Sequence, residues 1–346
     1  MRVVIAINSP ESEWRWPASA TERLRQQFPG VEFAEYDSRH GVDAAARALF
    51  SGAEAVVAWQ LAPELLRSAE ILRWVHSPAA AVHQLLSPEL VASPVMVTNG
   101  ASVHAPVVAE HGLALMLALA RGLPVAVRAQ ERKHWAAREL MRLGMVAADI
   151  GVGAASAVPS ITGTIAGSTA LLVGMGHIGR ELARRLNALG AVVLGVRRNP
   201  ARSDPDVAEM HAPGALRQLL PRADFVVLAV PATAATRSLM GAGEFGVMRR
   251  SAYLINLGRG TAVDEAALVA ALAAGQLAGA GLDVFVHEPL PASSPLWSCA
   301  RVLITPHVAA ITPASWDRQV ELFAAHLRKF LTDETVNPLV DKRRGY

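Results

Sequence analysis

The chain has 346 residues, of which 52% are hydrophobic and 18% are charged. This length suggests two domains, and the apolar content is enough for two cores and excludes a largely disordered chain. The net charge of +3, from 33 basic and 30 acidic residues, is too small to indicate a nucleic-acid surface. A single cysteine excludes an intrachain disulfide, and the N-terminal apolar run is too short for a secretory signal, so we expect a cytoplasmic protein.

The first third of the chain alternates short apolar runs with helical patterns, which is typical of a parallel sheet with crossover helices. The predicted strands are Val3–Ile7, Val31–Ala34, Ala55–Ala58 and Trp74–Val75, and the predicted helices are Thr21–Gln27 and Glu64–Ala69. A long apolar helix follows from Ala105 to Arg121, with Pro106 in its first turn. Because it carries Glu110 and His111, we expect a core helix and no membrane span.

A stretch rich in Gly, Ala, Ser and Pro, Ala147–Thr164, predicts a loop that introduces a second unit. The alternating pattern then restarts, and an amphipathic helix over Thr312–Phe330 returns to the first unit. The predicted strands of the second unit are Thr169–Val173, Ala191–Val196, Phe225–Ala229, Ala252–Asn256, Gly279–Asp283 and Val302–Ile304, with helices at Ile178–Leu189 and Glu265–Ala273.

The strongest local motif is a glycine loop that follows the first strand of the second unit and opens a helix. Gly174 permits a tight turn, Gly176 lets a pyrophosphate approach the backbone, and Gly179 lets the helix pack on the strand. The helix N-terminus then attracts phosphate groups. We therefore predict a dinucleotide site formed by Gly174, Met175, Gly176, His177, Ile178 and Gly179.

The end of the second strand in this unit predicts the type of dinucleotide. An NAD site usually has an acidic residue about 20 residues past the glycine loop, where it binds the ribose hydroxyls. Arg197 and Arg198 stand there in this chain. An arginine can make forked contacts with a 2′-phosphate, so we expect NADP(H) to be preferred, with NAD(H) still accepted.

Three further segments lie at predicted strand ends, where ligands of doubly wound sheets bind. They contain Arg259, Glu288 and His307 in that order, within Leu254–Gly260, Leu282–Leu290 and Thr305–Ala310. With these residues the chain resembles the D-isomer-specific 2-hydroxyacid dehydrogenase family over nearly its whole length, and most of all its glyoxylate/hydroxypyruvate reductases. The resemblance also covers Pro295–Trp297 and Ile304–Thr312.

The resemblance implies an α/β fold with two doubly wound parallel-sheet domains. A Rossmann-type dinucleotide-binding domain, 105–311, is then inserted in a flavodoxin-like substrate-binding domain formed by 1–104 and 312–346. The implied reaction is NAD(P)H-dependent reduction of a small 2-keto acid to the D-2-hydroxy acid. The resemblance also implies a homodimer with the active site in the cleft between its two domains.

The residue types fit this chemistry. Arg259 would bind the substrate carboxylate and polarise its carbonyl, and His307 would donate the proton. Glu288 would pair with His307, orient its ring and favour the imidazolium. The resemblance implies that Asp283 binds the carboxamide group of the nicotinamide and that Ala309 lies beside the nicotinamide ring. It also extends the cofactor site to Val230, Pro231, Thr236, Leu257 and Gly258.

The substrate carboxylate of the family is held on backbone amides of a loop that corresponds to His76–His83 here. Ala80 and Ala81 would present these amides, because backbone anion binding needs no side chain. The chain departs from the family at Ala81, where glycine is usual and alanine limits φ, and at His83, where aspartate is frequent.

Other functions remain open on the sequence alone. A dinucleotide-sensing regulatory protein of the same fold could keep all three catalytic residues, although no basic DNA-binding segment is visible. A formate or phosphite dehydrogenase would share the cofactor unit. We expect no metal site, because the histidines have no ligand spacing, and we expect neither nucleic acid nor membrane as a partner.

Overall fold

The computed structural model describes residues 1–7, 15–37, 41–138, 140 and 163–345. Contacts between Cα atoms divide the chain into two compact units. Unit 1 comprises Met1–His104 and Thr312–Tyr346, and unit 2 comprises Ala105–Ile311. The loop predicted over Ala147–Thr164 lies outside the described residues except for its last two.

Unit 1 is built on a parallel sheet of five strands in the order β2-β1-β3-β4-β5, which is the flavodoxin-like order. This confirms the parallel sheet predicted for the first third of the chain. The last strand was not predicted, because it runs directly into Asn99–Gly100, a turn-forming pair. The strands are β1 (Arg2–Ala6), β2 (Glu32–Glu35), β3 (Ala55–Ala58), β4 (Trp74–Ser77) and β5 (Met96–Asn99).

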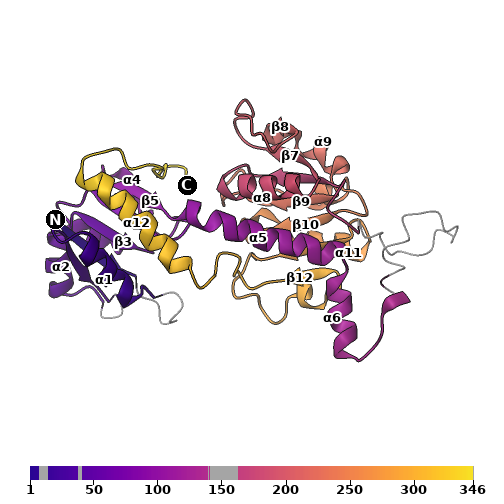
Figure 1. Cartoon of the computed structure of the whole chain (residues 1–346), viewed down its shortest axis with the longest axis horizontal. Coiled ribbons are helices and arrows are strands. Elements are labelled where there is room, and N and C mark those ends of the chain that lie inside the picture. The colour runs from indigo at the N-terminus through magenta and orange to yellow at the C-terminus, as the bar shows by residue number, and fades with distance from the viewer. Residues whose placement is uncertain (8–14, 38–40, 139, 141–162, 346) are drawn as a thin grey trace. The chain divides into compact units, whose positions relative to one another are not determined.

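Helices cover both faces of this sheet (Figure 1). On one face, α12 (Ser315–Leu331) packs beside α1 (Ala18–Gln27), and its Phe323 stacks on buried Trp74 with ring centroids 5.1 Å apart. The C-terminal helix therefore completes the core of unit 1, as its amphipathic pattern predicted. The other face is covered by α2 (Ala44–Ser51), α3 (Pro63–Ser68) and α4 (Pro88–Ala92).

Unit 2 has a parallel sheet of seven strands in the order β12-β11-β10-β9-β6-β7-β8. Counted within the unit, this is the doubly wound order of dinucleotide-binding domains, with the switch point between β6 and β9. The predicted fold class is confirmed. The strands are β6 (Thr169–Val173), β7 (Val192–Val196), β8 (Glu209–His211), β9 (Phe225–Leu228), β10 (Tyr253–Asn256), β11 (Gly279–Leu282) and β12 (Val302–Ile304).

Two hydrophobic cores lie on the two faces of the second sheet. The helices on one face include α8 (His177–Ala188), and those on the other include α11 (Glu265–Ala273). Further α-helices in the described part of this unit are α6 (Leu123–Glu131), α9 (Leu216–Leu219) and α10 (Ala242–Phe245). Short 3-10 turns lie at Pro213–Ala215, Leu220–Arg222, Gly260–Ala262 and Pro295–Ser298.

The long apolar helix α5 spans Ala101–Ala120 and begins four residues earlier than predicted. Pro106 therefore lies inside the helix and not in its first turn. At this internal position a proline removes one backbone hydrogen bond of the helix. By length and composition α5 could cross a membrane, with 44% of its apolar window buried. Its buried residues pack into the core shared with β6 and α8, which is the environment of a core helix.

Candidate functional site

The glycine loop of unit 2 joins β6 to α8, and two of its glycines leave no room for a side chain. Gly174 has a φ of +109°, and a Cβ there would collide with the carbonyl oxygen of Ala229. A Cβ on Gly179 would collide with the Gly174 carbonyl, whereas one on Gly176 would meet nothing within 4 Å. No side chain caps the N-terminus of α8. The close packing and the uncapped first turn fit a dinucleotide phosphate group.

The segments after β9 and β10 lie against this loop. A Cβ on Gly174 would contact Val230 Cγ1 at 3.1 Å, and one on Gly258 would meet the Val230 carbonyl oxygen at 2.7 Å. Thr236 Oγ1 donates to the Pro231 carbonyl at 2.6 Å and so closes its own loop. The Leu257 side chain is buried against α5. Three of the predicted cofactor segments, namely the glycine loop and the segments after β9 and β10, thus meet at one sheet edge, although Leu257 can offer only its backbone there.

Arg197 and Arg198 directly follow β7, as predicted. The Arg197 backbone amide donates to His211 at 3.0 Å, and its half-buried side chain reaches the carbonyl of Arg202 at 3.5 Å. The Arg198 side chain is exposed.

Arg259 follows β10 and is held by its own loop. Asn256 Nδ2 donates to the Arg259 carbonyl at 3.0 Å, and Arg259 Nη1 donates to the Gly258 carbonyl at 2.6 Å. Burial lowers the pKa of Arg259, and the negative charge of Glu288 opposes that shift. A Cβ on Gly260 would collide with the backbone of Phe285, so the Arg259 loop packs directly on the segment that leads to Glu288. The guanidinium is therefore a fixed, partly desolvated cation beside a carboxylate.

Glu288 and His307 form a close pair. His307 Nδ1 lies 2.6 Å from Glu288 Oε2, while the Phe285 amide donates to Glu288 Oε1 at 2.8 Å. The Glu288 carboxylate is thus fixed through both oxygens, and the His307 ring is oriented through Nδ1, which leaves Nε2 for a ligand. His307 also has a φ of +55°, a left-handed backbone that is uncommon outside glycine. Such strain is frequently found at functional residues.

The buried carboxylate of Asp283 holds the strained backbone around His307. Its Oδ1 accepts from the Thr305 hydroxyl at 2.6 Å and from the Val308 amide at 3.0 Å, and its Oδ2 accepts from the Ala309 amide at 3.1 Å. The His307 amide donates to the Asp283 carbonyl at 2.8 Å. Asp283, which was predicted to bind the nicotinamide carboxamide, is therefore a clamp for the loop that carries His307.

A chain of polar contacts links this clamp to α5. His111 Nε2 lies 2.9 Å from Thr305 Oγ1, whose proton is donated to Asp283. Sequence analysis missed Thr305 and His111, together with Asn256, which positions Arg259. Each is a polar residue in an otherwise apolar segment, and that signal could have identified them.

We expect Thr305→Val to lower kcat about tenfold and to destabilise the protein by about 1.5–3 kcal/mol, because a buried carboxylate loses a hydroxyl donor without a change in side-chain shape. Steady-state kinetics and thermal unfolding would measure the two effects. Thr332→Val, which removes an exposed hydroxyl at the end of α12, is the matched control. Unchanged kcat in Thr305→Val would show that the clamp does not position His307.

The predicted carboxylate loop of unit 1 follows β4. Ala80 and Ala81 are half-buried, and their backbone amides have no acceptor among the described residues. Ala81 is not among the residues with positive φ, so the loop has a conformation that alanine adopts freely and glycine is not required there. His83 is exposed.

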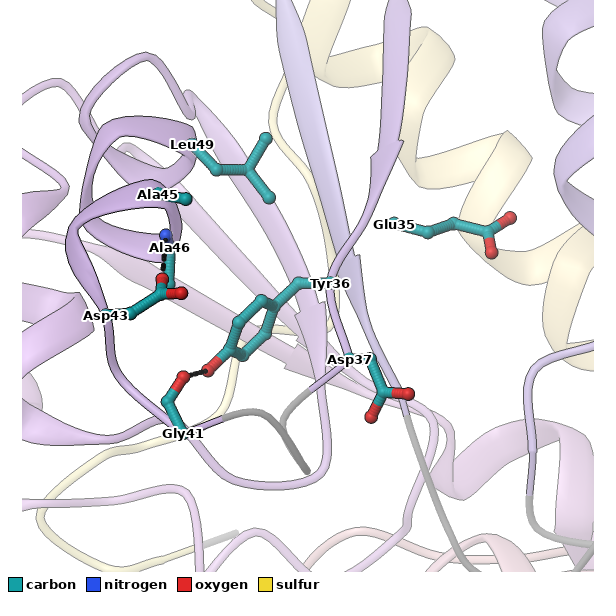
Figure 2. Close-up of a pocket in the computed structure, with 8 residues that line it drawn as sticks. All are labelled: Glu35, Tyr36, Asp37, Gly41, Asp43, Ala45, Ala46 and Leu49. Carbon is teal, nitrogen blue, oxygen red and sulfur yellow. Dashed lines mark hydrogen bonds between the residues drawn. The ribbon is translucent and has the colours of Figure 1, made fainter.

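A separate pocket of about 370 Å³ in unit 1 contains none of the predicted site residues (Figure 2). It lies at the end of β2, where Tyr36 donates to the Gly41 carbonyl at 2.8 Å and Asp43 caps α2. Glu35, Asp37 and Asp43 give it a negative lining, which disfavours a carboxylate ligand. In the described part of the chain, no group of three or more His, Cys, Asp or Glu side chains could hold a metal ion.

Comparisons with known proteins identify the relatives of this chain. The family model "D-isomer specific 2-hydroxyacid dehydrogenase, NAD binding domain" matches residues 113–309. A glyoxylate reductase of Korarchaeum cryptofilum is 32% identical over 284 residues, which cover 81% of this chain and 79% of that protein. A D-3-phosphoglycerate dehydrogenase of Mycobacterium tuberculosis is 35% identical over 254 residues, which cover 72% of this chain but 43% of that protein.

Solved structures give the same result for the fold. The NADPH-dependent glyoxylate/hydroxypyruvate reductase of Sinorhizobium meliloti, in complex with NADP and sulfate, matches with a TM-score of 0.76 at 27% identity. The match covers 100% of this chain and 99% of that one. The likeness therefore extends over both units.

Proposed function

This chain belongs to the D-isomer specific 2-hydroxyacid dehydrogenase family and is an NAD(P)-dependent oxidoreductase, and we propose that it reduces a small 2-keto acid to the D-2-hydroxy acid with NADPH. The observation that carries the proposal is the fixed pair of Glu288 and His307, with the Arg259 cation in electrostatic interaction with the Glu288 carboxylate. A 2-keto acid needs a cation for its charge and a proton donor for its carbonyl oxygen, and this pair and cation supply both.

The residues of the chain have separate roles in this proposal. Arg259 binds the substrate carboxylate and polarises the keto group, because its fork can donate to two oxygens at once. His307 Nε2 donates a proton to the carbonyl oxygen as negative charge develops there. Glu288 holds the ring through Nδ1 and stabilises the protonated imidazole before transfer. The bound nicotinamide cofactor supplies the hydride.

We assign the cofactor phosphates to the glycine loop and the uncapped first turn of α8. The NADP preference rests on Arg197 and Arg198, and on the absence of an acidic residue at the end of β7. The Sinorhizobium meliloti reductase, which is similar to this chain over the whole length of both, is NADPH-dependent, and this supports the preference. The Ala80 and Ala81 amides are proposed to bind the substrate carboxylate, since neither has an acceptor among the residues that the structure describes.

Glyoxylate and hydroxypyruvate are the substrates we propose first, because the glyoxylate reductase relative is similar over most of both chains. The test is a steady-state panel of glyoxylate, hydroxypyruvate, pyruvate and 3-phosphohydroxypyruvate, each with NADPH and with NADH. If 3-phosphohydroxypyruvate gave the highest kcat/KM of the panel, it would take the place of glyoxylate and hydroxypyruvate as the proposed substrate. Turnover of formate or phosphite with NADP⁺ would change the reaction class, and tight NADPH binding without any turnover would indicate a dinucleotide sensor.

Substitution of the arginines after β7 tests the cofactor preference. We expect Arg197→Gln combined with Arg198→Gln to raise KM for NADPH about 10- to 100-fold and to leave KM for NADH unchanged, since only the 2′-phosphate loses a charge-assisted partner. Arg217→Gln, another exposed arginine of unit 2, is the control. Equal effects on both cofactors would contradict a contact with the 2′-phosphate.

We also propose a cytoplasmic homodimer. Large apolar side chains are exposed near the end of α5 and along α6, namely Leu117 (38%), Leu123 (50%) and Val127 (53%). Such neighbouring exposed apolar residues are typical of an interface. Light scattering coupled to gel filtration gives the molar mass, and a mass equal to the 36.6 kDa chain would exclude the dimer.

A further inference from the structure

In the loop after β4, the carbonyl oxygens of three successive residues, Pro78, Ala79 and Ala80, each accept a hydrogen bond. Gln319 Nε2 donates to the Pro78 carbonyl at 2.7 Å, the Gly100 amide donates to the Ala79 carbonyl at 3.2 Å, and Asn99 Nδ2 donates to the Ala80 carbonyl at 2.9 Å. Gly100 has no room for a side chain, since a Cβ there would collide with both the Pro78 oxygen and Gln319.

This arrangement fixes the direction of the backbone amides. In a planar trans peptide, the carbonyl of one residue and the amide of the next point in opposite directions. Because the Ala79 and Ala80 carbonyls are held, the Ala80 and Ala81 amides point away from Asn99 and Gly100, and neither has an acceptor among the described residues. The loop therefore presents two adjacent, preoriented donors, as anion binding requires.

Gln319 is itself held by a histidine on α5. Its Nε2 lies 2.6 Å from His104 Nε2 and is 2.7 Å from the Pro78 oxygen, so its two protons satisfy both groups. Burial lowers the pKa of His104, the contact of its Nε2 with the Pro78 carbonyl oxygen at 3.2 Å opposes that shift, and the charge of Arg318 adds to it. Because the Gln319 amide nitrogen can only donate, its contact with His104 assigns the acceptor role to Nε2 of the ring. Gln319 is 3% exposed and comes from α12, far along the chain from the loop it holds.

Stability alone is a poor reason for this cluster. Gln319 Oε1 and His104 Nδ1 are buried without a hydrogen-bond partner. Unsatisfied polar atoms destabilise a core, and apolar side chains of the same shape at these two positions would be neutral or stabilising. The cluster therefore has a cost in stability that a role in function would explain.

We propose that Asn99, His104 and Gln319 form a carbonyl brace, a set of positioning residues that preorganises the Ala80 and Ala81 amides for the substrate carboxylate. The brace rests on the proposed function, because it acts only through binding of a 2-keto acid. It determines affinity for the carboxylate and not the chemical step, since its members hold the loop and do not touch the reacting atoms.

The test uses Gln319→Met, which keeps the side-chain volume and removes the donor, and Asn99→Leu, which removes the donor to Ala80. In both variants KM for the 2-keto acid is expected to rise about 10- to 100-fold, with kcat changed less than about threefold and the Kd for NADPH unchanged. For Gln319→Met, Tm is expected to stay the same or rise. A merely structural role would instead lower Tm and leave KM unchanged.

His326→Leu is the matched control. His326 is buried on α12 seven residues after Gln319 and contacts the rings of Trp74 and His76 on β4, not the Pro78–Ala81 backbone, so its loss should leave KM unchanged. Unchanged KM in Gln319→Met and Asn99→Leu, with an active wild-type enzyme, would overturn the brace while the proposed function stands.

If the wild-type protein reduces none of the 2-keto acids, the proposed function fails and the brace is tested by binding. Calorimetric titration with oxalate then serves as the probe. Weaker oxalate binding by Gln319→Met and Asn99→Leu than by the wild-type protein would support the brace. Equal binding in all three proteins, or no binding to the wild-type protein, would overturn it.

Discussion

Replacement of His307 by alanine is expected to lower kcat by about 10²–10⁴-fold, because the proposed reaction loses its proton donor. The Kd for NADPH should not change, since the glycine loop and α8 are separate from the His307 side chain. Steady-state kinetics with the best 2-keto acid and fluorescence titration of NADPH would measure the two quantities.

The left-handed backbone at His307 requires a second variant. Alanine is strained at a φ of +55°, so a loss in His307→Ala could come from a displaced loop and not from the missing proton. Asparagine tolerates this conformation but is not an acid at neutral pH. We therefore expect His307→Asn to lose as much activity as His307→Ala. Near-normal turnover in His307→Asn would remove the ring from the mechanism.

The fold was predictable because its signals are local. Short apolar runs that alternate with amphipathic stretches predicted two parallel sheets, and the glycine loop marked the start of the second one. The errors are of local origin too. The strand Glu209–His211 was missed because it is three residues long and has little apolar character, and the start of α5 was misplaced because Pro106 was taken as a first-turn proline.

The site was predictable only in part, for a physical reason. Residue types at strand ends identified Arg259, Glu288 and His307 as candidates, and the structure places all three in one unit with Glu288 in contact with His307 and close to Arg259. The groups that hold them could not be predicted, because these contacts join distant segments through side chains and backbone carbonyls. Gln319 donates to the carbonyl of a residue 241 positions earlier, and no local pattern marks such a pair.

This dependence on fixed geometry makes Arg259 the second residue with a large expected effect. In Arg259→Gln we expect kcat/KM for the 2-keto acid to fall about 10²–10³-fold, because the substrate carboxylate and the developing oxyanion both lose their cation. Burial lowers the pKa of the guanidinium, yet arginine stays charged at neutral pH, so the lost interaction is that of a full positive charge in a partly desolvated site.

Two further substitutions separate charge from shape. Arg259→Lys keeps the charge but loses the planar fork, so we expect a kcat/KM between those of the wild-type enzyme and Arg259→Gln. Arg250→Gln removes an exposed arginine of the same unit and should leave kcat/KM unchanged. If Arg259→Lys is as inactive as Arg259→Gln, the forked geometry of the guanidinium is essential. If Arg259→Gln retains the kcat/KM of the wild-type enzyme, Arg259 does not bind the substrate.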